Sequence, residues 1–511
     1  MRRLLTRHGP AVRWSIAAYV LAVVLVTSTF ARFWDQPILE QHAFRQTPTA
    51  LSVYWGVVDG WRLDYLTPVV GAPWSVPFEF PIFQWMVSVC WRLSGFPLDS
   101  CGRLTSFIFY LASSVVLARL LLLLKISAPA VAASSIAFLL APVHLFWGRA
   151  FLIESCALFM TLLYAAETVA VMSSRVLGWK YWFRVAILIL IASAAALIKI
   201  TTFVAGAVFA ILFLICRRYT APALQPWREY LKQAKLEYCA LLIPMVVAIA
   251  FTAAWVSYSD GVKQENFIAE LFTSRNLAVW NFGTNEQRLS RSLWLDTIWE
   301  RSISESIGWF AAITATLVGI LLIRGYQLWL LASFTLTYLA SFVVFTNLHI
   351  VHNYYQVAAA AWVVAALGVV LDRLQQISFP AFVTACSIVF AEQIYTFSGG
   401  YLPWIRDPLH LAAERTLRLA PAIQLMTEPD EVVLVLGYEW SSELAYYAER
   451  RTIAVPNFAG LAPKVVAQLN TMARPYNATL VVSCNDRIRS QVDHMLRQMQ
   501  QGAETKTPDA L

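Results

Sequence analysis

Charged residues are scarce in this sequence. They make up 14% of its 511 residues, whereas 59% of the residues are hydrophobic. A soluble globular protein has about 25% charged residues and about 45–50% apolar residues. Apolar runs of about twenty residues recur over most of the length, which indicates a helical protein that crosses a membrane many times. The scarcity of charge therefore excludes an ordinary soluble domain for most of the chain.

Cysteine pairs are missing as well. The seven cysteines show no CxxC spacing, so the sequence predicts neither a zinc site nor a disulfide framework. The net charge of +8 does not indicate a nucleic-acid partner. Most basic residues fall in short loops between apolar runs, where an excess of Lys and Arg marks the cytoplasmic side of a membrane protein.

The apolar runs predict about eleven membrane spans. The first run follows several arginines, but it is long and has no clear cleavage site, so we expect a retained span rather than a signal peptide. A further apolar segment, 81–96, is short and contains Gln84 and Arg92, which favours an interfacial or re-entrant helix. The predicted spans lie near 14–31, 104–124, 129–147, 154–172, 182–198, 201–216, 238–257, 307–323, 327–346, 354–371 and 378–397.

The basic residues predict how these spans are oriented. With a cytoplasmic N-terminus and a segment 81–96 that does not cross, the basic loops all lie inside, as the positive-inside rule requires. The polar motifs then all lie on the outer side of the cytoplasmic (inner) membrane, together with a first outer loop over 32–103 and another over 258–306. The inner loops contain Lys125, Arg217, Arg218, Arg324 and Arg373.

The composition changes near residue 399. Apolar strand-like segments there alternate with helical ones, which predicts a parallel sheet. We therefore expect a helical membrane domain over 1–398, followed by a small extracytoplasmic α/β domain over 399–511. This second domain has no GxGxxG and no P-loop motif. The expected strands are 431–437, 452–455 and 478–483, and the expected helices are 441–451 and 487–500.

Polar motifs adjoin the predicted spans at five places. Ionisable groups near a bilayer are costly and usually gather where they line a cavity. Since all five motifs are predicted on one side of the membrane, we expect them to form one site. They are Arg45-Gln46-Thr47-Pro48-Thr49-Ala50, Glu79-Phe80-Pro81-Ile82-Phe83-Gln84-Trp85, Gly148-Arg149-Ala150-Phe151-Leu152-Ile153-Glu154, Lys199 and His352-Asn353-Tyr354-Tyr355.

In this order the motifs resemble those of the PMT-type, ArnT-like (dolichyl-phosphate-mannose-protein mannosyltransferase-like) membrane glycosyltransferases of the GT-C fold, over roughly residues 10–400. The resemblance implies a hexosyl or pentosyl transfer from a polyprenyl-phosphate sugar donor to a lipid, glycan or protein acceptor at the outer membrane face. Relatives commonly carry an acidic residue in or beside the Arg-Gln element, where this sequence has Pro48. Glu79 and Glu40 are then the candidate catalytic bases.

The reaction that the resemblance implies suggests a role for each motif. A carboxylate must take the proton of the acceptor hydroxyl, and cations must stabilise the departing phosphate. Glu79 suits the first role, although it could also cap the helix that follows Pro81. Arg45 and Lys199 suit the second role, although a lysine at the end of a span often only extends its ammonium group to the membrane–water interface. The other predicted substrate-binding residues are Gln46, Arg149, Glu154, His349, His352, Tyr354 and Tyr355.

Several alternatives stay open at this point. Glu154 could simply be stabilised by the positive N-terminal end of its helix, or it could shape an acceptor-binding or metal-binding region. His349 and His352 provide two potential ligands, which do not make a metal site; no metal ligand is therefore assigned, and a requirement for a divalent cation is left open. The alternative functions are a flippase for lipid-linked sugars and a non-catalytic relative that binds the lipid. Transporters favour repeated halves and polar residues at mid-membrane, which this sequence does not show.

Overall fold

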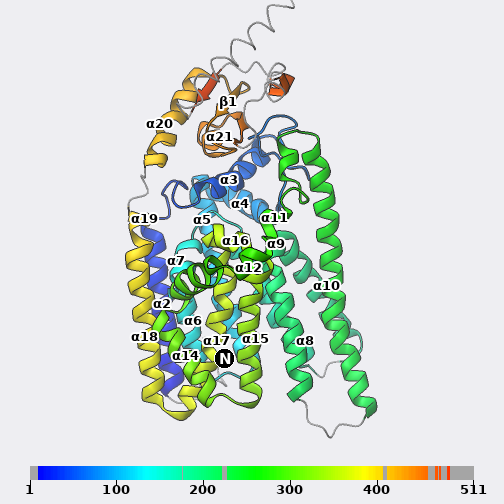
Figure 1. Ribbon diagram of the computed structural model, residues 1–511, viewed down its shortest axis with the longest axis vertical. Helices are drawn as coiled ribbons and strands as arrows, with labels where there is room; N and C mark the ends of the chain where they lie inside the picture. Colours follow the sequence, from blue (N-terminus) through cyan, green and yellow to red (C-terminus); the bar gives the residue numbers. More distant parts are fainter. Residues whose placement is uncertain are drawn as a thin grey trace, which may run out of the picture.

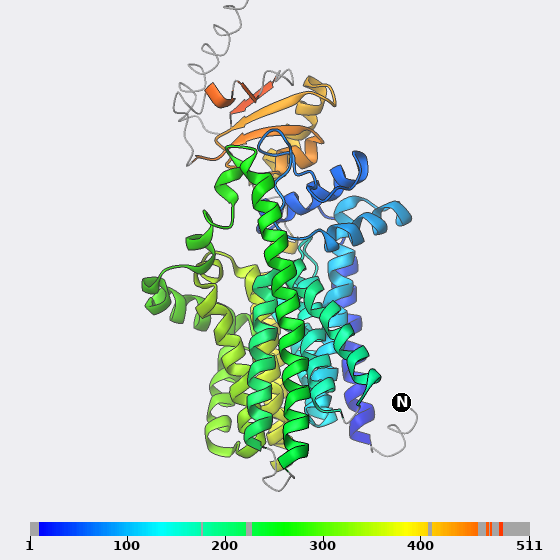
Figure 2. The same ribbon diagram turned by 90° about the vertical axis from the view of Figure 1, so that its right-hand side faces the viewer.

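The computed structural model describes residues 10–174, 177–220, 227–406, 411–457, 467–469, 471–472 and 480–483. Long helices run side by side as a bundle, and short helices and a small sheet lie at one end of it (Figure 1 and Figure 2). Within the described residues, eight helices are long and apolar enough to cross a membrane. The chain is therefore a multi-pass membrane protein.

Each predicted span overlaps a helix, but the segment predicted over 129–147 is divided at Ala141 into two helices and is not one continuous span. The 42-residue helix α9 contains two of the predicted spans, and two more overlap the shorter helices α6 (Ala128–Leu140) and α14 (Trp309–Leu322). The eight long helices are α2 (Pro10–Arg32), α5 (Leu98–Leu123), α8 (Glu154–Met172), α9 (Trp179–Thr220), α10 (Trp227–Gln264), α15 (Gly325–Val344), α17 (Gln356–Ile377) and α18 (Phe379–Gly400).

Helix α9 is two spans joined at Lys199. This residue has an extended backbone conformation, with φ −163° and ψ 99°, in the middle of the helix. Tyr181 near the first end of α9 and Arg217 near the last end hydrogen-bond to adjacent residues of α10. Both ends of α9 therefore lie at the same end of the bundle, and Lys199 lies at the opposite end, as the sequence predicts.

The end of the bundle away from Lys199 carries the predicted inner loops. Asp372 accepts hydrogen bonds there from the backbone N–H of Ser127 at 2.9 Å and from Gln327 at 2.8 Å. Tyr219 stacks on Trp329, with 5.0 Å between the ring centroids, so the last turn of α9 lies at the same end. The basic loops thus share one end of the bundle. We call the opposite end, where Lys199 lies, the motif end.

Two short helices of the first loop lie across the motif end (Figure 2). They are α3 (Ala43–Val58) and α4 (Ile82–Ser94). Helix α4 has 13 residues, whereas a span needs about twenty, so α4 does not cross the membrane on its own. The other short elements are α7 (Pro142–Trp147), η1 (Ala269–Phe272), α11 (Ala278–Phe282), α12 (Asn285–Leu289), η2 (Ser292–Ile303), α13 (Ser304–Ser306), α16 (Thr346–Val351), η3 (Asn353–Tyr355) and α19 (Leu402–Arg406).

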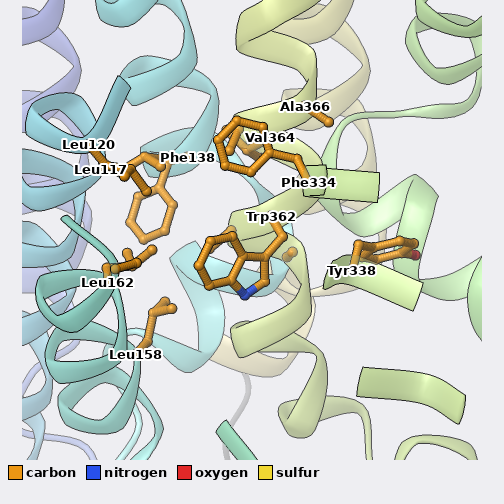
Figure 3. Close-up of a cluster of buried hydrophobic side chains, with 14 of the residues drawn as sticks. Leu117, Leu120, Phe138, Leu158, Leu162, Phe334, Tyr338, Trp362, Val364 and Ala366 are labelled. Atoms are coloured by element: carbon orange, nitrogen blue, oxygen red, sulfur yellow. The ribbon is translucent and has the colours of Figure 1, made fainter. Parts of the chain in front are cut away.

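Large apolar side chains fill the centre of the bundle. Figure 3 shows Leu117, Phe138 and Leu158 facing Phe334 and Trp362 from α15 and α17. Close packing of this kind resists small displacements. The core therefore holds the ends of these helices, which carry the polar motifs, in fixed relative positions.

The C-terminal residues form a parallel sheet at the motif end. Its strands are β1 (Val432–Leu436), β2 (Arg451–Val455) and β3 (Leu480–Ser483), in the order β2-β1-β3. Two helices accompany the sheet, α20 (Leu411–Met426) and α21 (Glu443–Ala448). The strands and the helix after β1 occur where the sequence predicts them, and the helix predicted over 487–500 lies outside the described residues.

The sheet and the first loop form one packing unit. The backbone N–H of Thr452 donates to Pro68 at 3.1 Å and that of Ala454 donates to Val69 at 2.7 Å, so a loop segment extends the edge of β2. At the start of α5, Asp99 accepts hydrogen bonds from two tyrosines of α21. Apolar residues of the loop and of the sheet also share one buried cluster. The composition change near residue 399 therefore does not separate two independently packed bodies.

Candidate active site

Arg45 and Glu79 form an ion pair at the motif end. Nη2 of Arg45 donates to Oε1 of Glu79 at 2.5 Å, and the two side chains remain 19% and 22% exposed. The guanidinium also lies over the ring of Phe78, 5.6 Å from its centroid. Burial opposes the charge on Arg45, but the carboxylate of Glu79 raises the Arg45 pKa above its usual range. The pair thus keeps two opposite charges partly exposed at the motif end.

Lys199 and Glu154 form a second, enclosed ion pair. The Lys199 ammonium donates to Glu154, and each side chain is only 3% exposed. Nζ of Lys199 also lies 3.9 Å from the centroid of the Tyr355 ring, which is a cation–π contact. The backbone break at Lys199 places this residue opposite the first turn of α8, where Glu154 begins the helix. Glu154 therefore both starts its helix and neutralises a buried cation.

The two ion pairs belong to one site. Arg45 interacts electrostatically with Glu154, Tyr354 and Tyr355 as well as with Glu79. His352 interacts in the same way with Arg45 and Lys199. Residues from α3, α8, α9 and η3 thus converge at the motif end, as the sequence predicts for Glu79, Lys199 and His352.

Histidine and aromatic rings form one wall of this site. The ring of His352 lies 5.4 Å from that of His42 and 5.1 Å from that of Tyr354, between centroids. Burial and the neighbouring charges of His42, Arg45 and Lys199 lower the pKa of His352 to about 3. His352 is therefore a neutral imidazole at neutral pH, which can donate or accept a hydrogen bond.

His349 faces the bundle. Its ring packs 4.4 Å from that of Phe342, and burial lowers its pKa to about 3. Its Nδ1 has no hydrogen-bond partner. Among the residues that the structure describes, no three His, Cys, Asp or Glu side chains are grouped to hold a metal ion.

Glu40 lies in a closed cluster with two arginines. Its carboxylate contacts Arg103 at 2.6 Å and Arg149 at 2.8 Å, and its side chain has no exposed surface. Burial alone would raise the pKa of Glu40, but the two guanidinium groups outweigh it and lower that pKa. This placement argues against Glu40 as the base and against direct substrate contact by Arg149, because a substrate reaches neither group. Both residues instead hold the first loop to the bundle.

Gln46 connects two of the motifs. Its Oε1 accepts a hydrogen bond from the backbone N–H of Phe151 at 2.9 Å, and its Nε2 donates to the carbonyl of Gln41 at 3.2 Å. The side chain is fully buried. Gln46 therefore orients the start of α3, which carries Arg45, rather than meeting a substrate.

Two residues near the pair are not among the predicted site residues. Lys263, at the end of α10, places Nζ 4.9 Å from the Phe78 centroid. Trp440, from the loop after β1, packs 5.8 Å from the same ring. Lys263 is only one polar residue among many in the loop predicted over 258–306, and Trp440 follows a strand of the distant second domain. No local pattern marks either residue, since both reach the site through tertiary packing.

Comparison with solved structures identifies the fold. The chain is similar to ArnT from Cupriavidus metallidurans bound to undecaprenyl phosphate, with a TM-score of 0.59 and 14% identity over 90% of this chain and 89% of that one. It is also similar to the archaeal oligosaccharyltransferase AglB from Archaeoglobus fulgidus in complex with an inhibitory peptide and a dolichol-phosphate, with a TM-score of 0.55 and 12% identity over 92% of this chain and 69% of that one. No family model and no curated protein matches the sequence. The chain therefore has the GT-C fold that the motif order suggests.

Proposed function

We propose that this protein is a glycosyltransferase that moves a hexosyl or pentosyl group from a polyprenyl-phosphate carrier to a hydroxyl of a lipid, glycan or protein acceptor. The observation that carries the proposal is the reachable Arg45–Glu79 pair, with 2.5 Å between Nη2 and Oε1. This pair combines a potential base with a phosphate-binding cation. It is found in a fold shared with an ArnT structure that contains undecaprenyl phosphate.

Glu79 is the proposed base. The acceptor hydroxyl gives its proton to the Glu79 carboxylate, and the acceptor oxygen forms a bond to the anomeric carbon. The bond from that carbon to the phosphate oxygen breaks, and the phosphate leaves with the electron pair. Glu79 is preferred to Glu40 and Glu154 because its side chain is 22% exposed and theirs are 0% and 3% exposed.

Arg45 is the proposed ligand of the carrier phosphate. A guanidinium can bind two phosphate oxygens at once, and that contact strengthens as negative charge develops on the leaving group. When the phosphate binds, it competes with Glu79 for Arg45. Donor binding thereby frees the Glu79 carboxylate for the acceptor.

Lys199 is the second cation proposed for the leaving phosphate, and it lies behind the aromatic wall. Its side chain is 3% exposed and its Nζ faces the Tyr355 ring at 3.9 Å. A direct phosphate contact requires Tyr355 or Glu154 to move aside. Without such a movement, Glu154 balances the charge of Lys199, and Lys199 instead orients Tyr355, which supplies a hydroxyl for the sugar or the phosphate.

The proposed location is the cytoplasmic membrane, with the motif end on the outer side. Lys125, Arg217 and Arg373 lie in or beside the loops at the other end, where basic residues favour the cytoplasm. The charged pairs are at one end of the bundle rather than at its middle. A transporter would place them near the middle, so this distribution supports transfer over translocation.

The test supplies polyprenyl-phosphate sugars, together with lipid, glycan and peptide acceptors that carry hydroxyl groups, to liposomes that contain the protein, and it follows both sugar transfer and sugar translocation. Wild type should transfer the sugar. Glu79→Gln should lose about 10²–10⁴-fold in rate, because that is the typical contribution of a general base. Glu286→Gln removes an exposed carboxylate of α12 and serves as the matched control, with full activity expected.

Three results would contradict the proposal in different ways. Full activity of Glu79→Gln removes Glu79 as the base. Translocation by wild type without transfer identifies a flippase. Binding of the donor by wild type, with neither transfer nor translocation, identifies a non-catalytic lipid-binding protein.

A further inference from the structure

A cavity of about 260 Å³, broadly open to solvent, lies between α3 and the C-terminal sheet. It is at the carboxyl ends of β1 and β2, since Tyr438 follows β1 and Asn457 follows β2. In open sheets of parallel strands, ligands bind at this edge. Its described lining includes Phe44, Tyr438, Glu439, Ser441, Glu443 and Asn457.

The polar groups of the cavity suit a ligand rich in hydroxyl groups. The Glu443 carboxylate accepts hydrogen bonds from Tyr438 at 2.6 Å and from Thr416 at 3.3 Å. It is 8% exposed, and no ion pair with a cation exists for it within the described part of the chain. A buried carboxylate with only neutral donors has lone pairs left for further donors. Hydroxyl groups bind carboxylates strongly, through short O–H···O⁻ hydrogen bonds.

The second carboxylate points to the same class of ligand. Glu439 accepts a hydrogen bond from the backbone N–H of Asn457 at 3.1 Å. Of the described residues that line the cavity, none is basic. Two carboxylates in a lining whose described residues include no cation repel phosphate and other anions. The pocket therefore disfavours an anion, and the neutral Ser441 and Asn457 beside the carboxylates favour a ligand with several hydroxyl groups.

Aromatic packing connects the cavity to the Arg45–Glu79 pair. The ring of Phe44, which lines the cavity, lies 4.8 Å from that of Trp440. Trp440 in turn packs 5.8 Å from Phe78, which precedes Glu79 in the chain. Phe44 also directly precedes Arg45, so the cavity and the ion pair are built on the same turn of α3.

We propose that this cavity binds a sugar ring of the acceptor. The proposal rests on the function proposed above, in which the acceptor must approach Glu79. Pockets for drug-sized ligands occupy about 300–1,000 Å³, so a slightly smaller cavity suits one ring. Carboxylates and the Asn457 amide bind its hydroxyls, and Phe44 offers an apolar surface to its C–H groups. The C-terminal sheet thereby selects a glycan-bearing acceptor.

Two variants test the cavity. Asn457→Trp places a large ring at an exposed position on its rim, which blocks it without removing a buried group. Glu443→Gln keeps the shape and removes the carboxylate charge. The matched control is Glu428→Gln, which changes an exposed carboxylate before β1 that does not line the cavity.

The first measurement is sugar binding to the full chain in lipid nanodiscs, by saturation-transfer NMR. The probes are the methyl glycosides of glucose, galactose, mannose and N-acetylglucosamine. At least one should bind to wild type and to Glu428→Gln, with the signal at least fivefold weaker in both cavity variants. Absence of binding by all four to wild type, or equal binding to Asn457→Trp, would overturn the proposal.

The second measurement separates this proposal from the proposed function. In the transfer assay, both cavity variants should raise KM for a glycan-bearing acceptor at least fivefold and leave KM for the donor unchanged. Transfer with unchanged acceptor KM in both variants would overturn the sugar subsite and leave the transferase standing. Sugar binding that is lost in Asn457→Trp, in a protein that shows no transfer, would support the subsite and reject the transferase.

Discussion

Two carboxylates of the same loop form ion pairs with arginines in different environments, one enclosed and one partly exposed. Glu40 is enclosed by Arg103 and Arg149 and has no exposed surface. Glu79 meets one arginine, Arg45, and stays 22% exposed. The closed cluster contains one more positive than negative charge, whereas the open pair is balanced.

The difference separates a structural role from a chemical one. A buried carboxylate that is paired with two guanidinium groups has few free lone pairs to accept a proton or to bind a substrate. Its removal takes the ion-pair partner away from two buried cations. An open pair can exchange partners, because an incoming phosphate competes for the arginine. Exposure and charge balance thus distinguish the two acids, although both stand in the same polar loop.

The largest effect should come from Glu40→Gln. Removing one partner of a buried ion pair typically costs about 3–5 kcal/mol. Here it removes the ion-pair partner of both arginines and leaves Arg103 only its weaker interaction with Asp99. We expect a poor yield of folded protein and a much lower unfolding midpoint in detergent. A Glu40→Gln protein as stable as wild type would show that the cluster does not hold the first loop.

Arg45→Lys should give the next largest effect. Lysine keeps the charge but cannot bind two phosphate oxygens as a fork. We expect roughly a 10-fold to 100-fold loss in kcat/KM for the donor, equal to about 1.4–2.7 kcal/mol. Steady-state transfer kinetics provide the measurement, and Arg275→Lys in the nearby exposed loop provides the control. Unchanged kinetics would remove Arg45 from the phosphate site.

Acid should destabilise the motif end through its histidines. The pKa of His349 and that of His352 are each about 3 in the folded protein, against about 6.5 in an unfolded chain. Their contribution to stability is therefore complete above pH 6.5 and declines as the pH falls toward 3. The decline is about 1.4 kcal/mol per pH unit for each histidine at most. Unfolding midpoints measured from pH 7.5 to 5 should fall, and less steeply in His352→Gln; rising midpoints would contradict the assignment.

The smallest effect should be that of Glu79→Gln on stability. Exposed and partly exposed ion pairs contribute about 0–1 kcal/mol, and the Arg45–Glu79 pair is partly exposed. We expect an unfolding midpoint within a degree or two of wild type. A loss as large as that of Glu40→Gln would mean that the two acids do not differ in role.

Local sequence features predict the spans and the position of the site. Hydropathy locates the helices because crossing a bilayer imposes an apolar composition on each segment. The polar Lys199 between two apolar runs correctly marks the break in α9. The alternation of strands and helices likewise locates β1 and β2.

Pairing between distant residues is not predictable from these features. Nothing in the sequence around Arg103 shows that it binds Glu40, so both Glu40 and Glu79 remain candidates until burial separates them. The sheet that packs on Pro68 and Val69 is also unexpected, because edge pairing depends on which backbone groups meet in space. Lys263 and Trp440 reach the site for the same reason.

The most direct test of the open pair is the affinity of Glu79→Gln for undecaprenyl phosphate, measured beside its transfer rate. If Arg45 exchanges between Glu79 and the carrier phosphate, removing the competing carboxylate should tighten phosphate binding several-fold while transfer falls by about 10²–10⁴-fold. Weaker phosphate binding in Glu79→Gln, or transfer at the wild-type rate, would contradict the account.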